Sequence, residues 1–561
     1  MAKYGSEIFG DLLKLLTLGV VLGLCGSFAA NLFVIGASSI FSNFTTSIKV
    51  ISGVSDFSAR LILLLLVGYS IIVLKRSAGL ERWHGPADTL AAVQIQGQRL
   101  DVKAGLVSTF AAFGSASAGA SVGQYGPILH FGASIGAFLK SMVPRGLSPD
   151  VYIAGGAAAA ISAGFGAPVA AVVLVSEAVL RHFSVRYVAP VVTASVVASA
   201  SSQLLFGRSS PYELTGLPLD MTQLMLPILV LGIVCALSAI TYMRSIAYLL
   251  AKTNSFESPL LTVSLAAIAM ALLGTLVPES AGLGTATINE LFGGSLSGRD
   301  ALVIFCAKFI ATVICLGAGF FGGVFSPALF LGATLGYLCG VGFISLGLDP
   351  IILPAMTVIG MAAFTSSVVG APIGITLICF EFTQSYSYAV ASLLGVSISS
   401  FISTRLYGYS YFDRQLRTRG LDLRKGGEFL SLKSVKVGAL PISPVFSVEK
   451  DLLCADVMKL AVESQSNEVV VVDGGAFLGT TTVTKLMPNP DKRVASVLLD
   501  NDLVLHADDD LAHAIDVIKN FIGEAIPIVD ENNVLLGGLS EGQILSGAMD
   551  FQEGLKRNER N

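Results

Sequence analysis

The chain has 561 residues, of which 53% are hydrophobic and only 13% charged, and its mean hydropathy is +0.74. This composition excludes a soluble globular protein and predicts a membrane protein with several spans. The net charge of −4 gives no sign of nucleic-acid binding, and seven scattered cysteines without a CxxC pair predict neither disulfides nor a metal site. No HExxH or Walker A motif occurs, so no enzyme and no catalytic residue is expected.

Apolar stretches fill the first three quarters of the chain after a short polar lead-in, residues 1–11. Several are shorter than the roughly 20 residues of a straight crossing or are cut by Gly and Pro, so tilted and half-spanning helices are expected. The predicted apolar stretches lie near 12–42, 60–75, 151–178, 188–206, 224–250, 259–278, 301–318, 327–346, 351–381 and 386–405.

Two places have the composition of a helix that begins abruptly inside an apolar region. At the first, Gly123 and Gly126 permit a tight turn, and Pro127 suits a first helical position. At the second, Gly323 and Pro327 repeat the arrangement, and both prolines open the pattern Pro-x-Leu-x-x-Gly-Ala-x-x-Gly. A helix that starts within a bilayer has unpaired N–H groups beside a cavity or site, and their partial positive charge can hold an anion.

Further matches in the same register indicate two related halves. A Gly-Ala-Pro triplet in each half is preceded by a glycine and followed by a glutamate at equal offsets. The matched positions are Gly156 and Gly360, Gly166–Pro168 and Gly370–Pro372, and Glu177 and Glu381. We expect repeat one over about 12–206 and repeat two over about 224–412, as in transporters whose broken helices meet near the midplane. The residues alone leave open whether the repeats are parallel or inverted.

The character of the chain changes at about residue 412. A basic run leaves the last span and predicts a cytoplasmic location for the remainder of the chain; it comprises Arg414, Arg417, Arg419, Arg424 and Lys425. Residues 426–550 read as an α/β domain built twice from a helix and two strands, and 551–561 read as a polar tail that frays. The predicted strands are 468–473, 477–482, 525–530 and 534–539, and the predicted helices are 451–463 and 509–521.

With these motifs in place, the chain resembles the CLC family of chloride channels and proton-coupled anion transporters over about residues 12–550. Gly123–Pro127 is similar to the family's G-[KR]-E-G-P, Gly323–Pro327 to its G-x-F-x-P, and His84–Asp88 to its G-[SH]-G-[IV]-P-E region. The C-terminal repeat resembles a CBS tandem. The resemblance implies a polytopic α-helical CLC fold over 1–425 with inverted repeats, plus a cytoplasmic CBS pair.

The same resemblance implies a homodimer in a lipid bilayer, with chloride as the transported ion and a bacterial inner membrane as the location. Its anion ligands are backbone N–H groups, which here belong to Tyr125 and Gly126 in the first half and to Val324 and Phe325 in the second. Amides suit chloride because they stabilise it without trapping it as a full positive charge would.

Two inner ligand positions stay open. The family uses a hydroxyl from its Ser-Gly-Ile-Pro loop, and His84 occupies that position here. Either His84 donates a ring N–H to the anion, or it faces away and the loop offers its backbone at Gly85. The family's second inner ligand is a tyrosine on the last membrane helix, and either Tyr411 or Phe412 matches it.

The largest departure from the family pattern is Tyr125, where the family has a gating glutamate. A phenol with a pKa of about 10 stays neutral and cannot replace an anion as a carboxylate can. Ala178, next to Glu177, stands where the family's transporters carry a second, proton-accepting glutamate. These departures predict passive chloride conduction, by a channel or an uncoupled carrier, with Tyr125 at the gate. The alternatives are a chloride/proton antiporter with another proton route, through His84, His130 or Glu177, and a non-conducting sensor regulated by the CBS pair.

In the CBS pair, Lys485 and Gln543 stand where the nucleotide-binding pattern has a ribose-binding Asp. This argues against adenine nucleotide binding, and no cofactor is expected.

Overall fold

The computed structural model divides into two compact units, which are described one at a time. Unit one comprises Met1–Gln94 and Arg99–Gly420, and unit two comprises Ile95–Gln98 and Leu421–Asn561. The boundary after Gly420 lies just ahead of the predicted one at 425. The structure describes residues 2–52, 55–95, 98–143, 147–183, 185–208, 210–212, 214, 219–256, 258–408, 410–499, 503–519 and 521–560.

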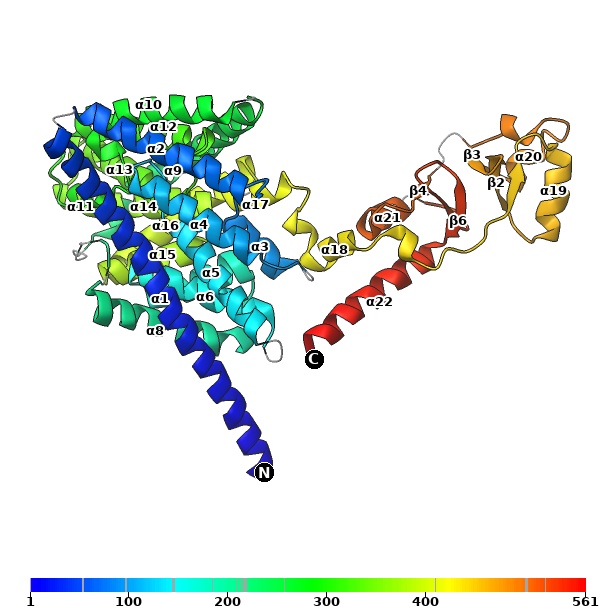
Figure 1. Cartoon of the computed structure of the whole chain (residues 1–561), viewed down its shortest axis with the longest axis horizontal. Helices are drawn as coiled ribbons and strands as arrows, with labels where there is room; N and C mark the ends of the chain where they lie inside the picture. Colours follow the sequence, from blue (N-terminus) through cyan, green and yellow to red (C-terminus); the bar gives the residue numbers. More distant parts are fainter. Residues whose placement is uncertain are drawn as a thin grey trace. The chain divides into compact units, whose positions relative to one another are not determined.

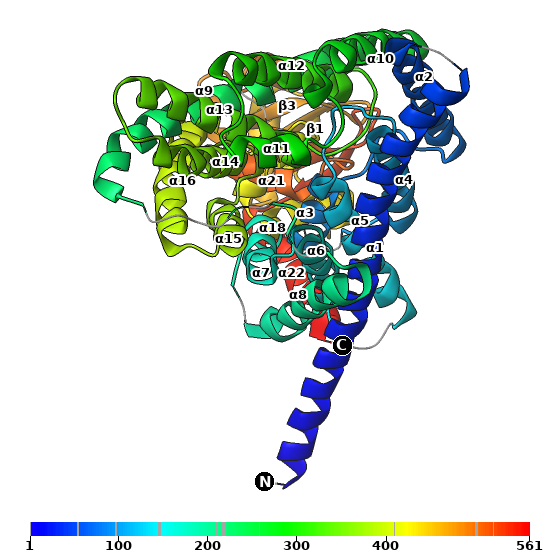
Figure 2. The same cartoon turned by 90° about the vertical axis from the view of Figure 1, so that its left-hand side faces the viewer.

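The first half of unit one is entirely helical in its regular structure. Its elements are α1 (Ala2–Ser52), α2 (Asp56–Ser77), α3 (Pro86–Gln94), α4 (Val102–Ser117), α5 (Tyr125–Met142), α6 (Pro149–Phe165), α7 (Pro168–Val175), the π-helix η1 (Ser176–Leu180) and α8 (Val185–Phe206). The long helix α1 packs along α6 and α8 (Figures 1 and 2). It begins at Ala2, so the predicted polar lead-in is part of the helix.

The second half repeats this order of helices. Its elements are α9 (Met221–Asn254), α10 (Pro259–Leu276), the short η2 (Pro278–Ser280), α11 (Thr285–Phe292), α12 (Gly298–Gly317), α13 (Phe325–Ser345), η3 (Pro350–Ile352), α14 (Leu353–Val369), α15 (Pro372–Thr383), α16 (Tyr386–Leu406) and α17 (Tyr411–Arg417). Within the described residues, nine helical segments are long and apolar enough to cross a membrane, while α7 and α15 are apolar but short.

The Gly-Ala-Pro triplets are breaks between helices. Gly166 and Gly370 end α6 and α14 in the left-handed conformation, with φ of 66° and 79°. Glycine suits this position because it has no Cβ to clash. Pro168 and Pro372 then open the next helices, where the missing N–H is not needed.

Helices α5 and α13 start earlier than predicted. Each begins two residues before its proline, at Tyr125 and Phe325, so Pro127 and Pro327 lie inside the first turn. Proline is tolerated there because the first N–H groups of a helix have no intrahelical partner. The turn therefore exposes N–H groups on the residues ahead of each proline.

Matched glycines hold each broken helix against the next one. A Cβ added at Gly132 would collide with the backbone carbonyl of Gly156, and one added at Gly332 would collide with that of Gly360. The later pair behaves alike: Gly136 and Gly336 lie against carbonyls of α6 and α14. The register found in the sequence therefore marks the closest helix crossings of both halves.

Unit two contains two small sheets of the same topology. The first is β1 (Ser447–Glu449), β2 (Glu468–Asp473) and β3 (Ala476–Thr482); the second is β4 (Leu505–His506), β5 (Ile526–Val529) and β6 (Leu535–Leu539). In each sheet the first pair is parallel and the second antiparallel, with a register shift at equivalent places. The helices are α18 (Gly427–Ser431), α19 (Cys454–Glu463), α20 (Val483–Leu486), α21 (Leu511–Ile518) and α22 (Glu541–Arg560), with short 3-10 turns between them.

The two sheets of unit two meet through a bridge between Ala476 and Val534, beside a shared apolar cluster. Figure 1 shows the helices and strands of this unit in yellow to red. The predicted strands and helices are present here, with ends that differ by a few residues. Helix α22 continues through the predicted polar tail to Arg560.

Candidate anion pathway

The N-termini of α5 and α13 meet head to head in unit one. Gly123 and Gly323 form an antiparallel bridge in which each N–H donates to the other's carbonyl oxygen over 2.7 Å. The Gln124 N–H donates to Ser326 Oγ over 3.1 Å. A Cβ on Gly123 would press on Pro327, and one on Gly323 on Pro127. The contact is reciprocal and antiparallel, so the two broken helices meet at equivalent residues.

Free backbone donors gather at this junction. The first N–H of α5 that donates to a backbone carbonyl is that of Ile128, to Gln124 over 2.9 Å, and in α13 it is that of Ala328, to Val324 over 3.1 Å. The N–H groups of Tyr125 and Gly126, and of Val324 and Phe325, precede these bonds and have no carbonyl partner in the described chain. Two helix N-termini therefore turn their partial positive charges toward one point.

Three aromatic rings close over the junction. Tyr125 stacks on Phe165 of α6 with ring centroids 3.6 Å apart and planes at 17°, and meets Phe325 edge-on at 5.6 Å. Phe165 and Phe325 are 5.5 Å apart. Tyr125 is only 1% exposed, and its hydroxyl has no hydrogen-bond partner among the described residues. The ring is therefore packed on two sides, and the buried hydroxyl makes no hydrogen bond in this part of the chain.

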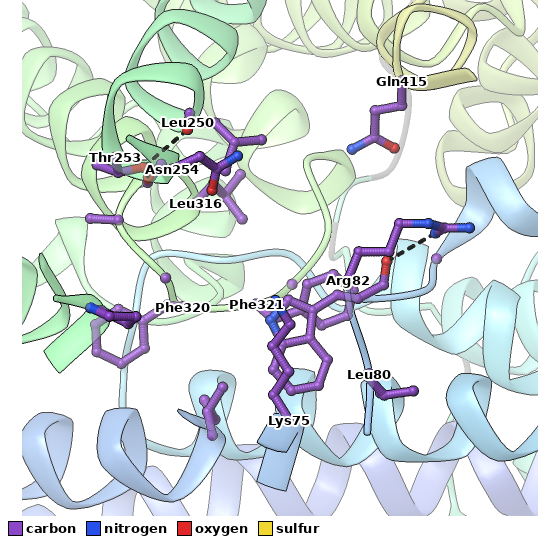
Figure 3. Close-up of a pocket in the computed structure, with 18 of the residues that line it drawn as sticks. Lys75, Leu80, Arg82, Leu250, Thr253, Asn254, Leu316, Phe320, Phe321 and Gln415 are labelled. Carbon is purple, nitrogen blue, oxygen red and sulfur yellow. Dashed lines mark hydrogen bonds between the residues drawn. The ribbon is translucent and has the colours of Figure 1, made fainter. Parts of the chain in front are cut away.

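A pocket of about 550 Å³ opens beside the junction. Four of the predicted anion-binding residues line it, namely Gly85, Val324, Tyr411 and Phe412. Both candidates on α17 therefore face the same space. Its cations are Lys75, Arg76, Arg82 and Arg419, against one acid, Glu81. Figure 3 shows Lys75, Arg82, Phe321 and Gln415 in this lining. Such a surplus of positive charge attracts anions.

The other predicted ligands lie off this pocket. His84, Tyr125, Gly126 and Phe325 are not among its lining residues. The His84 N–H donates to Ser108 Oγ over 2.9 Å, and its ring Nδ1 is buried without a partner in the described structure. Burial lowers the pKa of His84, although the nearby charge of Asp88 raises it, so the ring is neutral at neutral pH.

The loop that carries His84 is fixed by Asp88. Its Oδ2 accepts the Gly85 N–H over 2.9 Å, and its Oδ1 pairs with Arg82 at 2.6 Å and Arg419 at 2.9 Å. Burial raises the pKa of Asp88, but the Arg82 hydrogen bond and the Arg419 charge outweigh it and hold the pKa below its usual range. Sequence reasoning missed this triad, since only the acid in the first turn of α3 hinted at it.

Glu177 and Glu381 cap each other's repeat. Glu177 accepts the N–H groups of Ile373 and Gly374 at 3.2 and 2.8 Å, at the start of α15. Glu381 accepts those of Val169 and Ala170 at 3.0 and 2.7 Å, at the start of α7. Both carboxylates thus bind helix N-termini, which stabilise negative charge. This arrangement matches a structural role for the pair.

Ala178 lies in the π-helix η1, 8% exposed. The Gln94 side chain closes this turn by donating to the carbonyls of Val179 and Leu180 at 2.8 and 2.6 Å. His130 is buried in α5, with Nδ1 2.8 Å from the Thr89 hydroxyl and Nε2 without a partner in the described chain. Neither Ala178 nor His130 lines the pocket.

In unit two, the positions of the expected ribose-binding Asp residues are occupied by bonded side chains. The Gln543 amide accepts the Ser540 N–H at 2.9 Å and donates to Ser443 Oγ at 2.8 Å. Lys485 Nζ donates to the Leu498 carbonyl at 2.6 Å.

Comparison with known proteins gives consistent matches. The family model of the voltage gated chloride channel matches residues 63–404, and that of the CBS domain matches 494–550. The voltage-gated ClC-type chloride channel ClcB of Salmonella dublin is 30% identical over 338 residues, 58% of this chain and 79% of that protein. The H(+)/Cl(-) exchange transporter ClcA of Vibrio cholerae is 27% identical over 337 residues, 57% and 70% of the two chains.

Solved structures agree on the fold. A slow cyanobacterial Cl⁻/H⁺ antiporter superposes with a TM-score of 0.64 at 21% identity, over 73% of this chain and 99% of that one. A eukaryotic CLC transporter does so with a TM-score of 0.60 at 18% identity, over 95% and 98%. The predicted fold, a helical membrane unit followed by an α/β CBS region, is confirmed.

Proposed function

Because this chain belongs to the voltage-gated chloride channel family, we propose that it conducts chloride passively, with Tyr125 as a gate that carries no proton. The observation that carries the proposal is the packing of Tyr125, the first residue of α5, against Phe165 and Phe325 where the free N–H groups of α5 and α13 meet. A neutral phenol at this point can block or release an anion without a protonation step.

The inner ligand of the anion is sought among the residues that line the pocket. Tyr411 lines it and ends in a hydroxyl donor, whereas its neighbour Phe412 offers only an apolar edge. We therefore favour Tyr411 as the donor. Gly85 lines the pocket but does not donate its N–H to the anion, because this N–H already donates to Asp88. Ala178 adds no proton acceptor in η1.

A second candidate is chloride/proton exchange, which the name of the similar ClcA transporter describes. One observation favours it: the rings of His84 and His130 each have a buried nitrogen without a partner in the described chain. A proton route would then use these rings in place of the two glutamates that we infer to be replaced.

The deciding experiment measures chloride efflux from liposomes that hold the full-length protein, with valinomycin present and external pH recorded. Rapid chloride loss without proton uptake is expected. Proton movement in a fixed ratio to chloride would contradict the passive proposal and favour the exchanger.

Removal of the gate gives the sharpest variant. We expect Tyr125→Ala to raise the chloride flux tenfold or more, since the stacked ring is lost. Tyr125→Phe is the matched control, because it keeps the ring and should keep the low flux. Tyr125→Glu should make flux depend on pH, with faster efflux near the carboxyl pKa of about 4.3 than at neutral pH. Equal fluxes in all three variants would exclude a gate at this position.

We also propose a homodimer in a bacterial inner membrane, with unit two in the cytoplasm and no bound nucleotide. The family membership and the basic run after α17 support the assembly and the orientation. Native mass spectrometry in detergent should give twice the chain mass. A cysteine introduced at the exposed Glu463 of unit two should escape a labelling reagent that cannot cross the membrane of intact cells and should react after the cells are opened.

A further inference from the structure

The two ends of α9 mark the two faces of unit one. Its C-terminal residues Thr253 and Asn254 line the pocket described above, and α9 is 34 residues long, which corresponds to about 50 Å. Met221, at the other end of α9, therefore lies on the opposite face. Arg208 and Tyr212 precede Met221 in the chain, and neither of them lines the pocket.

A chain of hydrogen bonds anchors Arg208 above the gate. Its Nη1 donates to Asn31 Oδ1 at 3.2 Å, and the fully buried Asn31 donates to Ser202 Oγ at 3.0 Å. Ser202 in turn contacts the Ala163 carbonyl at 3.4 Å. The next residue, Gly164, lies against the Tyr125 ring. Arg208 is thus tied to the backbone that supports the gate.

Tyr212 is fixed by contacts with α11 and α15. Its ring packs on Phe382 with centroids 5.3 Å apart, and the carbonyl of Pro211 accepts a hydrogen bond from Asn289 at 3.3 Å. Tyr212 is only 4% exposed. Burial raises the pKa of Tyr212, and the neighbouring Tyr125 phenol raises it further.

The donor that the gate offers is the Tyr125 hydroxyl. Tyr125 is only 1% exposed, and its hydroxyl forms no hydrogen bond within the described residues. Buried polar groups are costly to leave unpaired, so such a site is normally filled by water or an ion. The guanidinium of Arg208 has five donors and gives one of them to Asn31.

We propose that Arg208, together with the hydroxyls of Tyr212 and Tyr125, forms an outer capture site for a halide, one step beyond the gate. This inference rests on the proposed chloride pathway and adds the residue that collects the anion on that face. A half-buried cation supplies long-range attraction, and the two phenols supply donors at short range. Capture of this kind raises the local anion concentration before the ring moves.

The kinetic test compares Arg208→Gln with Arg299→Gln. Arg299 is exposed at the first turn of α12, whose last residue Gly317 lines the pocket, so it carries the same charge on the same face without facing the gate. Arg208→Gln should raise the chloride concentration for half-maximal flux by about three- to tenfold, the effect of one partly screened charge. Arg208→Lys should recover part of this shift, and an inert salt should reduce it. An equal shift in both Gln variants would overturn the proposal.

A binding measurement separates this site from conduction. Crystals of the full-length protein grown in sodium bromide should show an anomalous bromide peak within contact of Arg208 and Tyr212, which Arg208→Gln removes. This peak in a protein that moves no chloride would support the site and contradict the proposed function. Chloride flux with bromide bound only between α5 and α13 would support the function and overturn the site.

Discussion

The two halves of unit one share a scaffold but present different side chains at their junction. The residues that hold helices together are matched in pairs: Gly132 with Gly332, Gly136 with Gly336, and Glu177 with Glu381. The residue at the tip of each broken helix is not matched, since Tyr125 in the first half corresponds to Phe325 in the second. Duplication therefore accounts for the shared scaffold, and under the proposed function the unmatched tip residues set how passage of the anion is gated.

The matched glycines give the largest expected effect. An alanine at Gly136 would press its Cβ into the Tyr152 carbonyl, and one at Gly336 into that of Met356. Since backbone cannot move aside as a side chain can, we expect each change to cost about 3 kcal/mol. The measurement is the temperature at which the detergent-solubilised protein loses its monodisperse peak.

The control for this prediction is Gly342→Ala, also in α13. Nothing lies within 4 Å of a Cβ at that position. Alanine should be neutral there or stabilise the helix by up to about 1 kcal/mol. If Gly136→Ala were as stable as Gly342→Ala, the close crossing of α5 and α6 would be wrong.

Asp88 tests the loop that carries His84. Asp88→Asn leaves Arg82 and Arg419 without their shared carboxylate, so we expect a loss of about 2 kcal/mol at neutral pH. The folded-state pKa of Asp88 is lowered, so its contribution is present above the usual carboxyl pKa of about 3.9 and disappears as pH falls through the lowered value. The stability difference from wild type should therefore shrink in acid.

Thermal unfolding of the two proteins across this pH range gives the comparison, with Asp550→Asn as the exposed control. If the stability difference between wild type and Asp88→Asn stayed constant down to strong acid, the geometry of the hydrogen bonds, and not the charge of Asp88, would fix the loop.

The repeats could be predicted from the sequence because they depend on glycine and proline at fixed spacing. Close helix crossings demand glycine, and helix starts tolerate proline, so Gly132 and Pro168 mark structure directly. The Arg82–Asp88–Arg419 triad could not be found this way, since Arg419 is far from the other two in the chain and no local pattern joins them. Long-range ion pairs depend on how elements pack.

The starts of α5 and α13 were misplaced for a local reason. A proline suits any position in the first helical turn, so Pro127 limits where the helix starts without fixing it. The fixing contact is the Gly123–Gly323 bridge, which joins the two repeats. The partnerless hydroxyl of Tyr125 was equally out of reach, because burial and hydrogen bonding at one atom depend on neighbours from several helices.

The paired carboxylates give a smaller effect that should be symmetric. Glu177→Ala and Glu381→Ala each leave two helix N–H groups without an acceptor, so each should cost about 1–2 kcal/mol. The same thermal assay measures both, with exposed Glu290→Ala as the control. A loss in one variant only would show that the two caps are not equivalent, and that one glutamate has another role beside its cap.

Unit two also combines a matched scaffold with different side chains at equivalent positions. The smallest effect, no change in melting temperature, is expected when nucleotide is added to it. Its two sheets are matched, but Gln543 is bonded to Ser540 and Ser443, and Lys485 to Leu498. No carboxylate is offered to a ribose at either position. Adenosine triphosphate should therefore leave the melting temperature of the full-length protein unchanged, because a ligand stabilises the folded state only through the binding it gains there.

The control for nucleotide binding is the pair of variants Gln543→Asp and Lys485→Asp, each of which introduces the carboxylate. A saturable rise in melting temperature in either variant, with none in wild type, would show that these side chains exclude the nucleotide. A saturable rise in wild type would mean that the pair binds it through groups other than a ribose carboxylate. Lys485 and Gln543 would then differ from the expected Asp without a loss of nucleotide binding. Tyr125 and Phe325 likewise differ from each other while the scaffold around them is the same.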